Sequence, residues 1–263
     1  MKKNPLGQAE SMRESGINPT LNTHGSCYVC GNPATFVADV SEWGSVRESM
    51  HCTVCQSSSR KRHVVKILLD LYAPSARFLY EAKPALSAIS IYSAVSNDHL
   101  HLSLGPENPN YVCSEYFPEV EEGKEKDGVV CQNLERLTFS DQQFDIVITE
   151  DVFEHIRKPE KAFAEIHRVL KQDGRHIFTI PFMFDRKTLR RVNTDTGEDV
   201  HVMPPDYHLD TLRNRILVYT DFGYDLFDLL NALGFQTEVS FFQHRDAMTL
   251  GIADSYVFIS RKI

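Results

Sequence analysis

Short apolar runs alternate with helical patterns from residue 77 onward. This alternation predicts parallel β-strands joined by helical crossovers, because strands covered on both faces have nearly continuous apolar runs. The candidate strands are residues 78–82, 111–114, 128–131, 144–149 and 176–180, and a later pair at 236–242 and 256–261 could form an antiparallel edge. The pattern therefore predicts an α/β fold around one mainly parallel sheet.

Three segments have helical spacing. Residues 59–72 form the first, and residues from about 221 to 233, followed by Gly234, form the last. The clearest helix lies between the fourth and fifth strands, where Pro159 suits the first turn and Gly174 suits the end. Its expected buried stripe is Ala162, Phe163, Ile166, Val169 and Leu170.

The remaining segments set the expected organisation. Residues 1–23 are polar, without periodicity, and are predicted to be a flexible tail. Residues 24–62 form a cysteine-bounded module, and residues 63–263 form the α/β domain. Within that domain, the irregular segment of about residues 182–220 leaves the end of a strand and is expected to cover a bound acceptor.

Composition narrows the possible partners. The 263 residues carry a net charge of -8, which disfavours general nucleic-acid binding. A local basic run at Arg60, Lys61 and Arg62 is interpreted as solvated charge, or as a seat for one phosphate or carboxylate. No apolar run suits a membrane helix or an export signal, so we expect a soluble, cytoplasmic protein. Its oligomeric state is left open, with a homodimer as one arrangement.

Two Cys-x-x-Cys pairs, Cys27 with Cys30 and Cys52 with Cys55, are separated by 21 residues. Each two-residue spacer lets both thiolates face one ion, and two such turns complete the tetrahedron that Zn²⁺ prefers. The alternatives are redox-active dithiols or unrelated cysteines. The spacing favours a structural zinc site, since protein would fill all four positions.

Residues 137–155 (LTFSDQQFDIVITEDVFEH) and 162–174 (AFAEIHRVLKQDG) resemble the class I S-adenosylmethionine-dependent methyltransferase superfamily, of the type 11-like kind. Residues 52–63 (CTVCQSSSRKRH) are similar to a subset with an N-terminal four-cysteine zinc module. The resemblance implies a Rossmann-like, seven-stranded methyltransferase sheet. It also implies S-adenosylmethionine as cofactor and, for this subset, a small-molecule acceptor of the sugar or secondary-metabolite type.

The resemblance also implies roles for residues at strand ends. Glu115, after the second strand, would accept hydrogen bonds from the ribose hydroxyls, although it could also be a solvated strand-end acid. Asn133 and Leu134, after the third strand, would contact adenine, and Glu150, after the fourth, would pair with the methionine ammonium group.

The first strand is where the sequence departs from the family. Glu81 and Ala82 stand where the family has a glycine-rich turn against the cofactor, and they are followed by Lys83 and Pro84. A methyltransferase-like binding or regulatory module without transfer activity is therefore an alternative function. A zinc-ribbon nucleic-acid binder, or a nucleic-acid methyltransferase, is a third.

Two histidines are candidate catalytic bases. His155 follows the fourth strand, and His208 lies in the long segment expected to cover the acceptor. An imidazole has a suitable pKa for taking a proton from an acceptor hydroxyl. His155 could instead have a helix-capping or packing role, because a Glu-His pair at this place is common in members of the family with different acceptors.

Overall fold

The computed structural model describes residues 20–39, 46–96, 98–105, 108–210, 214–242 and 250–263. These residues form two compact units. The first unit contains the chain up to residue 88, with residues 102–104 and 240–257, and the second contains residues 89–101, 105–239 and 258–263. The predicted boundary between residues 62 and 63 lies inside a helix of the first unit, α3 (Ser59–Tyr72).

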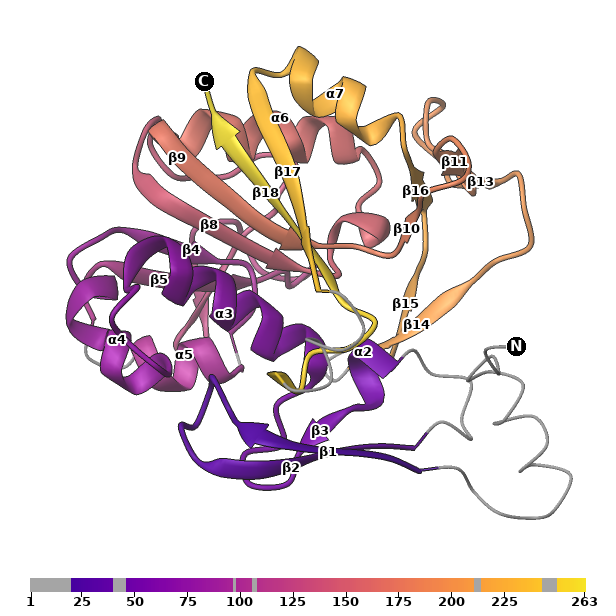
Figure 1. The fold of residues 1–263 in the computed structure, drawn as a ribbon. Helices are drawn as coiled ribbons and strands as arrows, with labels where there is room; N and C mark the ends of the chain where they lie inside the picture. Colours follow the sequence, from indigo (N-terminus) through magenta and orange to yellow (C-terminus); the bar gives the residue numbers. More distant parts are fainter. Residues whose placement is uncertain (1–19, 40–45, 97, 106–107, 211–213, 243–249) are drawn as a thin grey trace, which may run out of the picture. The chain divides into compact units, whose positions relative to one another are not determined.

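The first unit holds a small antiparallel sheet and three helices, drawn in indigo and purple in Figure 1. Its strands are β1 (Thr20–Ser26), β2 (Pro33–Asp39) and β3 (His51–Cys52), in the order β1-β2-β3. Its helices are α2 (Val46–Ser49), α3 and α4 (Leu79–Leu86). Residues 20–23 were expected in a tail but pair with β2, whereas residues 1–19 lie outside the described part of the chain.

Helix α3 has the predicted bounds. The Ser58 side chain caps it by accepting a hydrogen bond from the backbone N–H of Lys61 at 3.3 Å. Val64, Val65, Leu68 and Leu69 are buried, as the apolar spacing predicts. Among the described residues, no helix is long and apolar enough to cross a membrane.

The prediction of a strand at residues 78–82 was wrong, because this segment is the start of α4. The apolar residues Leu79, Ala82 and Leu86 are spaced along one helical face and are buried together. Arg77 and Glu81 form an i,i+4 ion pair of 2.5 Å on the outside of this turn. The apolar run of three residues was too short to distinguish the two-residue period of a strand from the 3.6-residue period of a helix.

The second unit is built on one mixed sheet with the order β17-β18-β9-β8-β4-β5-β7-β6. Its bounds are β4 (Ile91–Ser93), β5 (Tyr111–Glu115), β6 (Glu125–Lys126), β7 (Val129–Cys131), β8 (Phe144–Glu150), β9 (Leu170–Thr179), β17 (Phe235–Phe241) and β18 (Tyr256–Lys262). β4, β5, β7, β8 and β9 run parallel, and β18 pairs antiparallel with β9, which confirms an antiparallel edge. The predicted α/β fold is confirmed.

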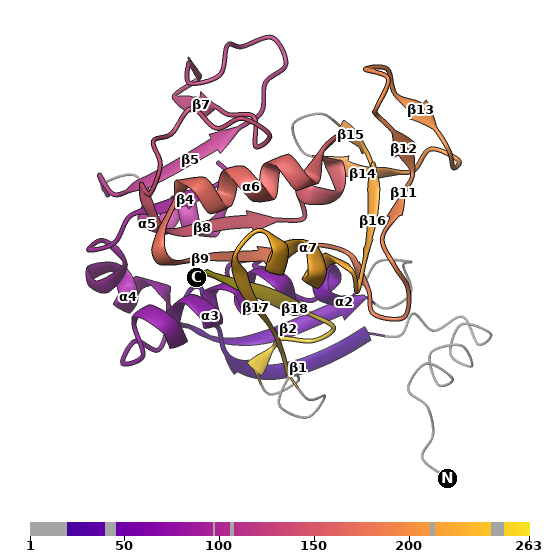
Figure 2. The same ribbon diagram turned by 90° about the horizontal axis from the view of Figure 1, so that it is seen from above.

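Helix α6 (Pro159–Val169) runs alongside β8 and β9 (Figure 2). Ala162, Phe163, Ile166 and Val169 are fully buried, as predicted, and the Phe163 ring stacks on Phe153 at 3.9 Å. The helix ends earlier than expected, because Gly174 lies inside β9. A side chain at Gly174 would meet the carbonyl oxygens of Lys171 and Asp145, so this glycine permits a close approach of two strands.

The long segment after β9 contains short strands in place of an irregular loop. They are β10 (Phe182–Met183), β11 (Leu189–Arg190), β12 (Val192–Asn193), β13 (Val200–His201), β14 (Tyr207–Asp210), β15 (Asn214–Leu217) and β16 (Thr220–Gly223). The last predicted helix was placed too early. Residues 220–223 pair with β10 and β11, and helix α7 (Leu226–Ala232) follows them. Alternating burial at Thr220 and Phe222 fits a strand.

Candidate functional site

The order of the large sheet defines where a ligand would bind. β4 lies between β5 and β8, and the chain runs from β4 through β5 to β7 on one side before it returns to β8 and β9 on the other. In open parallel sheets, ligands bind beyond the carboxyl ends of the strands at such a reversal. Glu115 ends β5 and Glu150 ends β8, so both predicted cofactor residues lie at this edge.

Glu115 connects the two strands at this edge. Its Oε1 accepts hydrogen bonds from the backbone N–H and the hydroxyl of Ser96, both at 3.1 Å. Ser96 belongs to the turn that follows β4, so the carboxylate holds this turn against the end of β5. Sequence reasoning missed Ser96, because the first strand had been placed thirteen residues too early.

The turn after β7 is held by side-chain amides. Asn133 Oδ1 accepts from the backbone N–H of Glu135 at 2.9 Å, and the buried Gln132 side chain exchanges two hydrogen bonds with Thr138. Leu134 is 8% exposed and gives the turn an apolar surface. Asn133 and Leu134, the predicted adenine contacts, thus lie in an ordered turn, in which Asn133 Oδ1 already accepts one hydrogen bond.

Glu81 and Ala82 do not stand at this edge of the sheet. Both lie in α4 of the first unit, where Glu81 pairs with Arg77 and Ala82 is buried. The strand that occupies the first position is β4, and the turn after it begins with Ala94 and Val95. The reason for assigning Glu81 and Ala82 to the cofactor is therefore removed, as is the reason for expecting Lys83 and Pro84 in the site.

The structure brings the two predicted histidines together, although they are 53 residues apart. His155 ends the short 3-10 helix η1 (Phe153–His155) just beyond β8, and His208 lies on β14. His208 Nδ1 is 3.2 Å from His155 Nε2, and the rings are nearly perpendicular. His155 Nδ1 lies 2.8 Å from the carbonyl oxygen of Leu217, so it carries the proton and leaves Nε2 as an acceptor.

Glu154 completes this group, and sequence reasoning did not single it out. Its side chain is 1% exposed, and Oε1 lies 3.5 Å from His208 Nδ1 and 3.7 Å from His155 Nε2. Burial raises the pKa of Glu154, and the side-chain interaction with Glu154 raises the pKa of His208. We call Glu154, His155 and His208 the histidine cluster.

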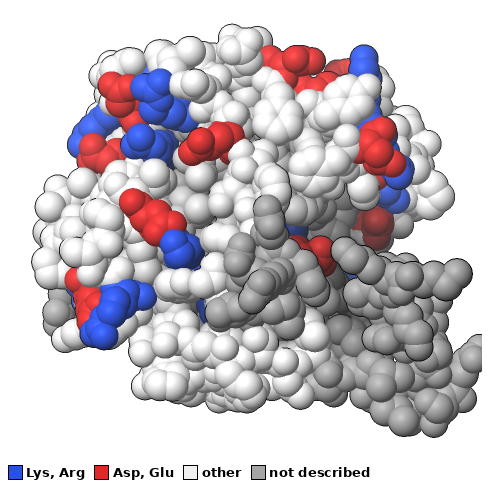
Figure 3. All heavy atoms as spheres, in the orientation of Figure 1, with Lys and Arg blue, Asp and Glu red and all other residues white. Residues whose placement is uncertain are grey.

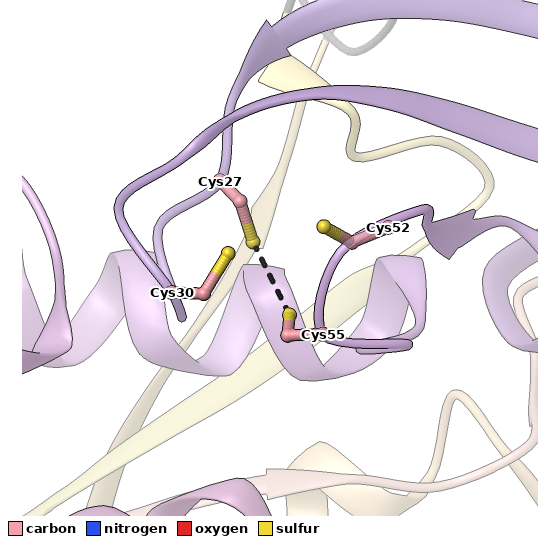
Figure 4. Close-up of side chains that lie close together, drawn as sticks. All are labelled: Cys27, Cys30, Cys52 and Cys55. Carbon is pink, nitrogen blue, oxygen red and sulfur yellow. Dashed lines mark hydrogen bonds between the residues drawn. The ribbon is translucent and has the colours of Figure 1, made fainter.

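The four predicted metal ligands also lie together, in the first unit (Figure 4). Their Sγ atoms are within 4.8 Å of one another, and those of Cys27 and Cys55 are 3.8 Å apart. The two turns have the same form: Gly31 N–H donates to Cys27 O at 2.8 Å, and Gln56 N–H donates to Cys52 O at 2.9 Å. Both Gly31 and Gln56 have positive φ, which closes each turn behind its second cysteine.

The interaction of Cys27 with Cys55 raises the pKa of the Cys27 thiol to about 12 and lowers the pKa of Cys55. An ion that binds here would replace the Cys27 proton, because the thiolate is the form that binds a metal.

The basic run beside these cysteines is not the solvated charge that the sequence indicated. Arg62 is fully buried and Lys61 is 7% exposed, while Arg60 pairs with Glu48 at 2.6 Å. On the face drawn in Figure 3, acidic and basic side chains are interspersed, without one large basic area. Arg62 is thus a structural residue of the first unit, and sequence reasoning missed this role because a buried arginine is uncommon.

Comparisons with known proteins agree with this architecture. Residues 106–178 match the family model described as a methyltransferase domain. No curated protein matches. Similar solved structures include a Mesorhizobium loti S-adenosylmethionine-dependent methyltransferase, with 13% identity, TM-score 0.43 and coverage of 69% of this chain and 97% of that one.

Two further structures are similar to a comparable extent. The Haloferax volcanii complex of the Trm112 methyltransferase activator with a methyltransferase has 12% identity, TM-score 0.44 and coverage of 77% and 89% of the two chains. A Burkholderia thailandensis 1,6-didemethyltoxoflavin-N1-methyltransferase has 14% identity, TM-score 0.37 and coverage of 76% and 83%. At these scores the structures carry no argument about function. The family match runs from just before β5 almost to the end of β9, so this part of the chain is similar to a methyltransferase domain.

Proposed function

We propose that this protein transfers a methyl group from S-adenosylmethionine to a small-molecule acceptor of the sugar or secondary-metabolite type. The observation that carries the proposal is the position of Glu115, which ends β5 at the reversal of the sheet and holds the turn after β4 through Ser96. A carboxylate suits a vicinal diol because it accepts two hydrogen bonds and donates none.

The other residues at this edge fit the remaining parts of the cofactor. Leu134 offers an apolar surface to adenine, and Asn133 offers an amide group to it. Glu150, which is 7% exposed, offers a carboxylate to the ammonium group of the methionine part. When bound, S-adenosylmethionine supplies an electrophilic methyl group and leaves as S-adenosylhomocysteine. The chain's own contribution is to orient the cofactor and the acceptor in a dry site.

We assign the acceptor's proton to His208. If His155 Nε2 accepts from His208 Nδ1, then Nε2 of His208 carries a lone pair and can take a proton from an acceptor hydroxyl or amine. The His208 side chain is 40% exposed, so a substrate can reach it, whereas Glu154 behind it is buried. The positive charge that forms on His208 would be stabilised by the Glu154 carboxylate.

The four cysteines are proposed to bind one structural Zn²⁺. Tetrahedral geometry with bonds of about 2.3 Å gives sulfur–sulfur distances of about 3.8 Å. The observed 3.8 Å between the Cys27 and Cys55 sulfur atoms agrees with that value. Four thiolates leave no open position, so this ion would stabilise the first unit and take no part in the transfer.

A binding module without transfer activity is the second candidate. The turn after β4 begins Ala94-Val95-Ser96 and has no glycine among these residues, so the backbone cannot approach a ligand as closely as a glycine-rich turn would allow. This alternative predicts binding of cofactor or product without turnover.

Calorimetric titration of the full chain with S-adenosylmethionine and S-adenosylhomocysteine tests the proposal. Glu115→Ala removes two charge-assisted hydrogen bonds of about 1.5 kcal/mol or more each, so affinity should fall at least about 100-fold. Glu125→Ala, an exposed acid on β6, is the matched control and should bind normally.

No binding of either ligand to the wild-type chain contradicts both candidate functions. Binding without release of S-adenosylhomocysteine from a pool of hydroxylated and aminated acceptors favours the binding module. Turnover that is lost in His208→Ala, with cofactor affinity unchanged, supports the methyltransferase and the role of His208.

A further inference from the structure

We infer that the histidine cluster is a binding site for a divalent cation of the zinc class, with one coordination position open. The inference deepens the proposed function at the same site, and it rests on that function only for the role of the ion toward an acceptor. The metal site itself stands on the distances, burial and hydrogen bonds of Glu154, His155 and His208.

The three candidate ligand atoms form a triangle of the size that such an ion requires. His208 Nδ1, His155 Nε2 and Glu154 Oε1 are separated by 3.2, 3.5 and 3.7 Å. Tetrahedral zinc with bonds of about 2.0–2.2 Å separates its ligands by about 3.3–3.6 Å, whereas octahedral geometry gives about 3.0 Å. The triangle therefore matches one face of a tetrahedron, and its fourth corner has no ligand in the cluster.

The buried carboxylate is an independent indication of a cation. Neither oxygen of Glu154 has a hydrogen-bond partner within the described part of the chain, although the side chain is 1% exposed. Burying a carboxylate without hydrogen bonds or a countercharge is strongly unfavourable. An ion held between Oε1 and the two imidazoles would supply a countercharge that neutral imidazoles at 3.5 and 3.7 Å do not provide.

The imidazole of His155 is already oriented as a ligand. Its Nδ1 donates to the carbonyl oxygen of Leu217 at 2.8 Å, so its Nε2 lone pair points at the cluster. Metal-binding histidines commonly donate their second nitrogen to such a partner, which fixes the tautomer. The two rings meet at 88°, so they approach a shared ion from different directions.

The three side chains differ in exposure, and the most exposed one gives an ion access to the cluster. Glu154 and His155 are 1% and 8% exposed, whereas His208 is 40% exposed and lies at the open side. Asp151 and Asp206 are close enough for their charges to act on His208, and they would favour a cation there.

An ion at this site would change how the acceptor is activated. The Nδ1 of His208 would release its proton to solvent and become a ligand, and an acceptor oxygen would take the fourth position. A bound cation lowers the pKa of such a hydroxyl, so its proton would go to water. With the ion bound, His155 and His208 would position it, and the proton-accepting role assigned to His208 above would belong to the metal-free cluster.

The experiment uses the full chain loaded with one molar equivalent of Zn²⁺, which the four thiolates would bind first, and titrates it with Co²⁺. We expect one additional Co²⁺ per chain, with visible d–d absorption but without the thiolate-to-cobalt charge-transfer band of a cysteine site. Glu154→Gln and His208→Ala should weaken this binding at least about 100-fold, since losing even an outer-shell partner costs 10–100-fold. His201→Ala, an exposed histidine on β13, should bind Co²⁺ as the wild type does.

Absence of a second ion in the wild-type chain overturns the inference, as does unchanged Co²⁺ affinity in both Glu154→Gln and His208→Ala. Melting curves by circular dichroism verify that these variants fold, and the isosteric Glu154→Gln tests the site even where alanine disturbs β14. Cofactor binding is measured separately by calorimetry. Co²⁺ binding without cofactor binding would refute the methyltransferase and leave the metal site standing, and the reverse result would refute only the metal site.

Discussion

Replacing Arg62 tests whether a buried cation holds the first unit together. The guanidinium is fully buried on α3 and lies over the Phe36 ring at 4.4 Å. It donates to the carbonyl oxygens of Gly251 and Met50 at 2.8 and 3.1 Å, and also to the carbonyl oxygen of Ser57. Arg62→Met keeps the apolar stem but removes the donors and the charge.

The magnitude follows from what the substitution leaves behind. The carbonyl oxygens of Gly251 and Met50 would lose the Arg62 donor, whereas that of Ser57 keeps a hydrogen bond from the Cys52 N–H at 3.0 Å. Each unsatisfied group costs about 1–3 kcal/mol. Local relaxation recovers part of this, so we expect a loss of about 2–4 kcal/mol in the free energy of unfolding. Burial lowers the pKa of Arg62 to about 10, while the charges of the four cysteines act in the opposite direction. Thiolates at the four cysteines would therefore favour the cation, so an ion bound by them should be released faster from the variant.

Two measurements check this expectation. Urea unfolding followed by circular dichroism gives the stability, and a chromophoric chelator gives the rate of zinc release. Arg62→Lys should be intermediate, because one ammonium group retains the charge but cannot reach all three carbonyls. Lys66→Met, on the same helix, is the control, since its ion pair with Asp70 is partly exposed. A change below about 0.5 kcal/mol in Arg62→Met, within the range of ordinary surface substitutions, would refute this reasoning.

Three further predictions concern stability. Gly251→Ala should lower the free energy of unfolding, measured in urea, by at least about 1–3 kcal/mol, because φ is +65° and a Cβ would lie 2.3 Å from the Phe36 ring. Gly197→Ala is the control for backbone strain alone, since Gly197 has a φ of +86° and open space around it. Equal losses in the two variants would contradict a clash with Phe36. Metal removal by a chelator, or Cys52→Ser, should lower the melting temperature, and an unchanged melting curve would exclude a structural ion. His176 has its pKa lowered to about 3 by burial. The unfolded chain, with a histidine pKa of about 6.5, therefore binds a proton at this position that the native state does not bind, so His176 should contribute a fall in stability of about 1.4 kcal/mol per pH unit below about pH 6. His176→Phe should show a shallower decline, and parallel curves would oppose this assignment.

The local sequence pattern predicted the structure correctly where an amphipathic segment was long or where the spacing of residues along the chain restricted the geometry. Helices α3 and α6 were predictable because apolar residues recur at helical spacing over three turns or more. The four-cysteine cluster was predictable because each two-residue spacer restricts where its thiols can point. The position of Glu115 at the end of a strand was predictable, because it follows an apolar run that forms β5 in the structure.

Short elements could not be assigned in this way. β4 has only three residues, Ile91–Ser93, and its partners β5 and β8 lie about 20 and 55 residues further along the chain. The apolar run at residues 78–82 fits the two-residue period of a strand and the 3.6-residue period of a helix equally well. In the structure its apolar residues are buried on one face of helix α4. This single error displaced the first turn of the cofactor site onto Glu81 and Ala82.

The sequence by itself determined the fold class, the clustering of the four cysteines and the similarity to a methyltransferase domain, since these depend on local periodicity, spacing and motif. Only the tertiary structure decided that His155 and His208 meet, because β14 brings a distant segment back to the end of β8. It likewise decided that Glu154 and Arg62 are buried, which no local pattern of charged residues would indicate. Burial of a charge is a property of everything packed around it, and that environment is assembled from long-range contacts.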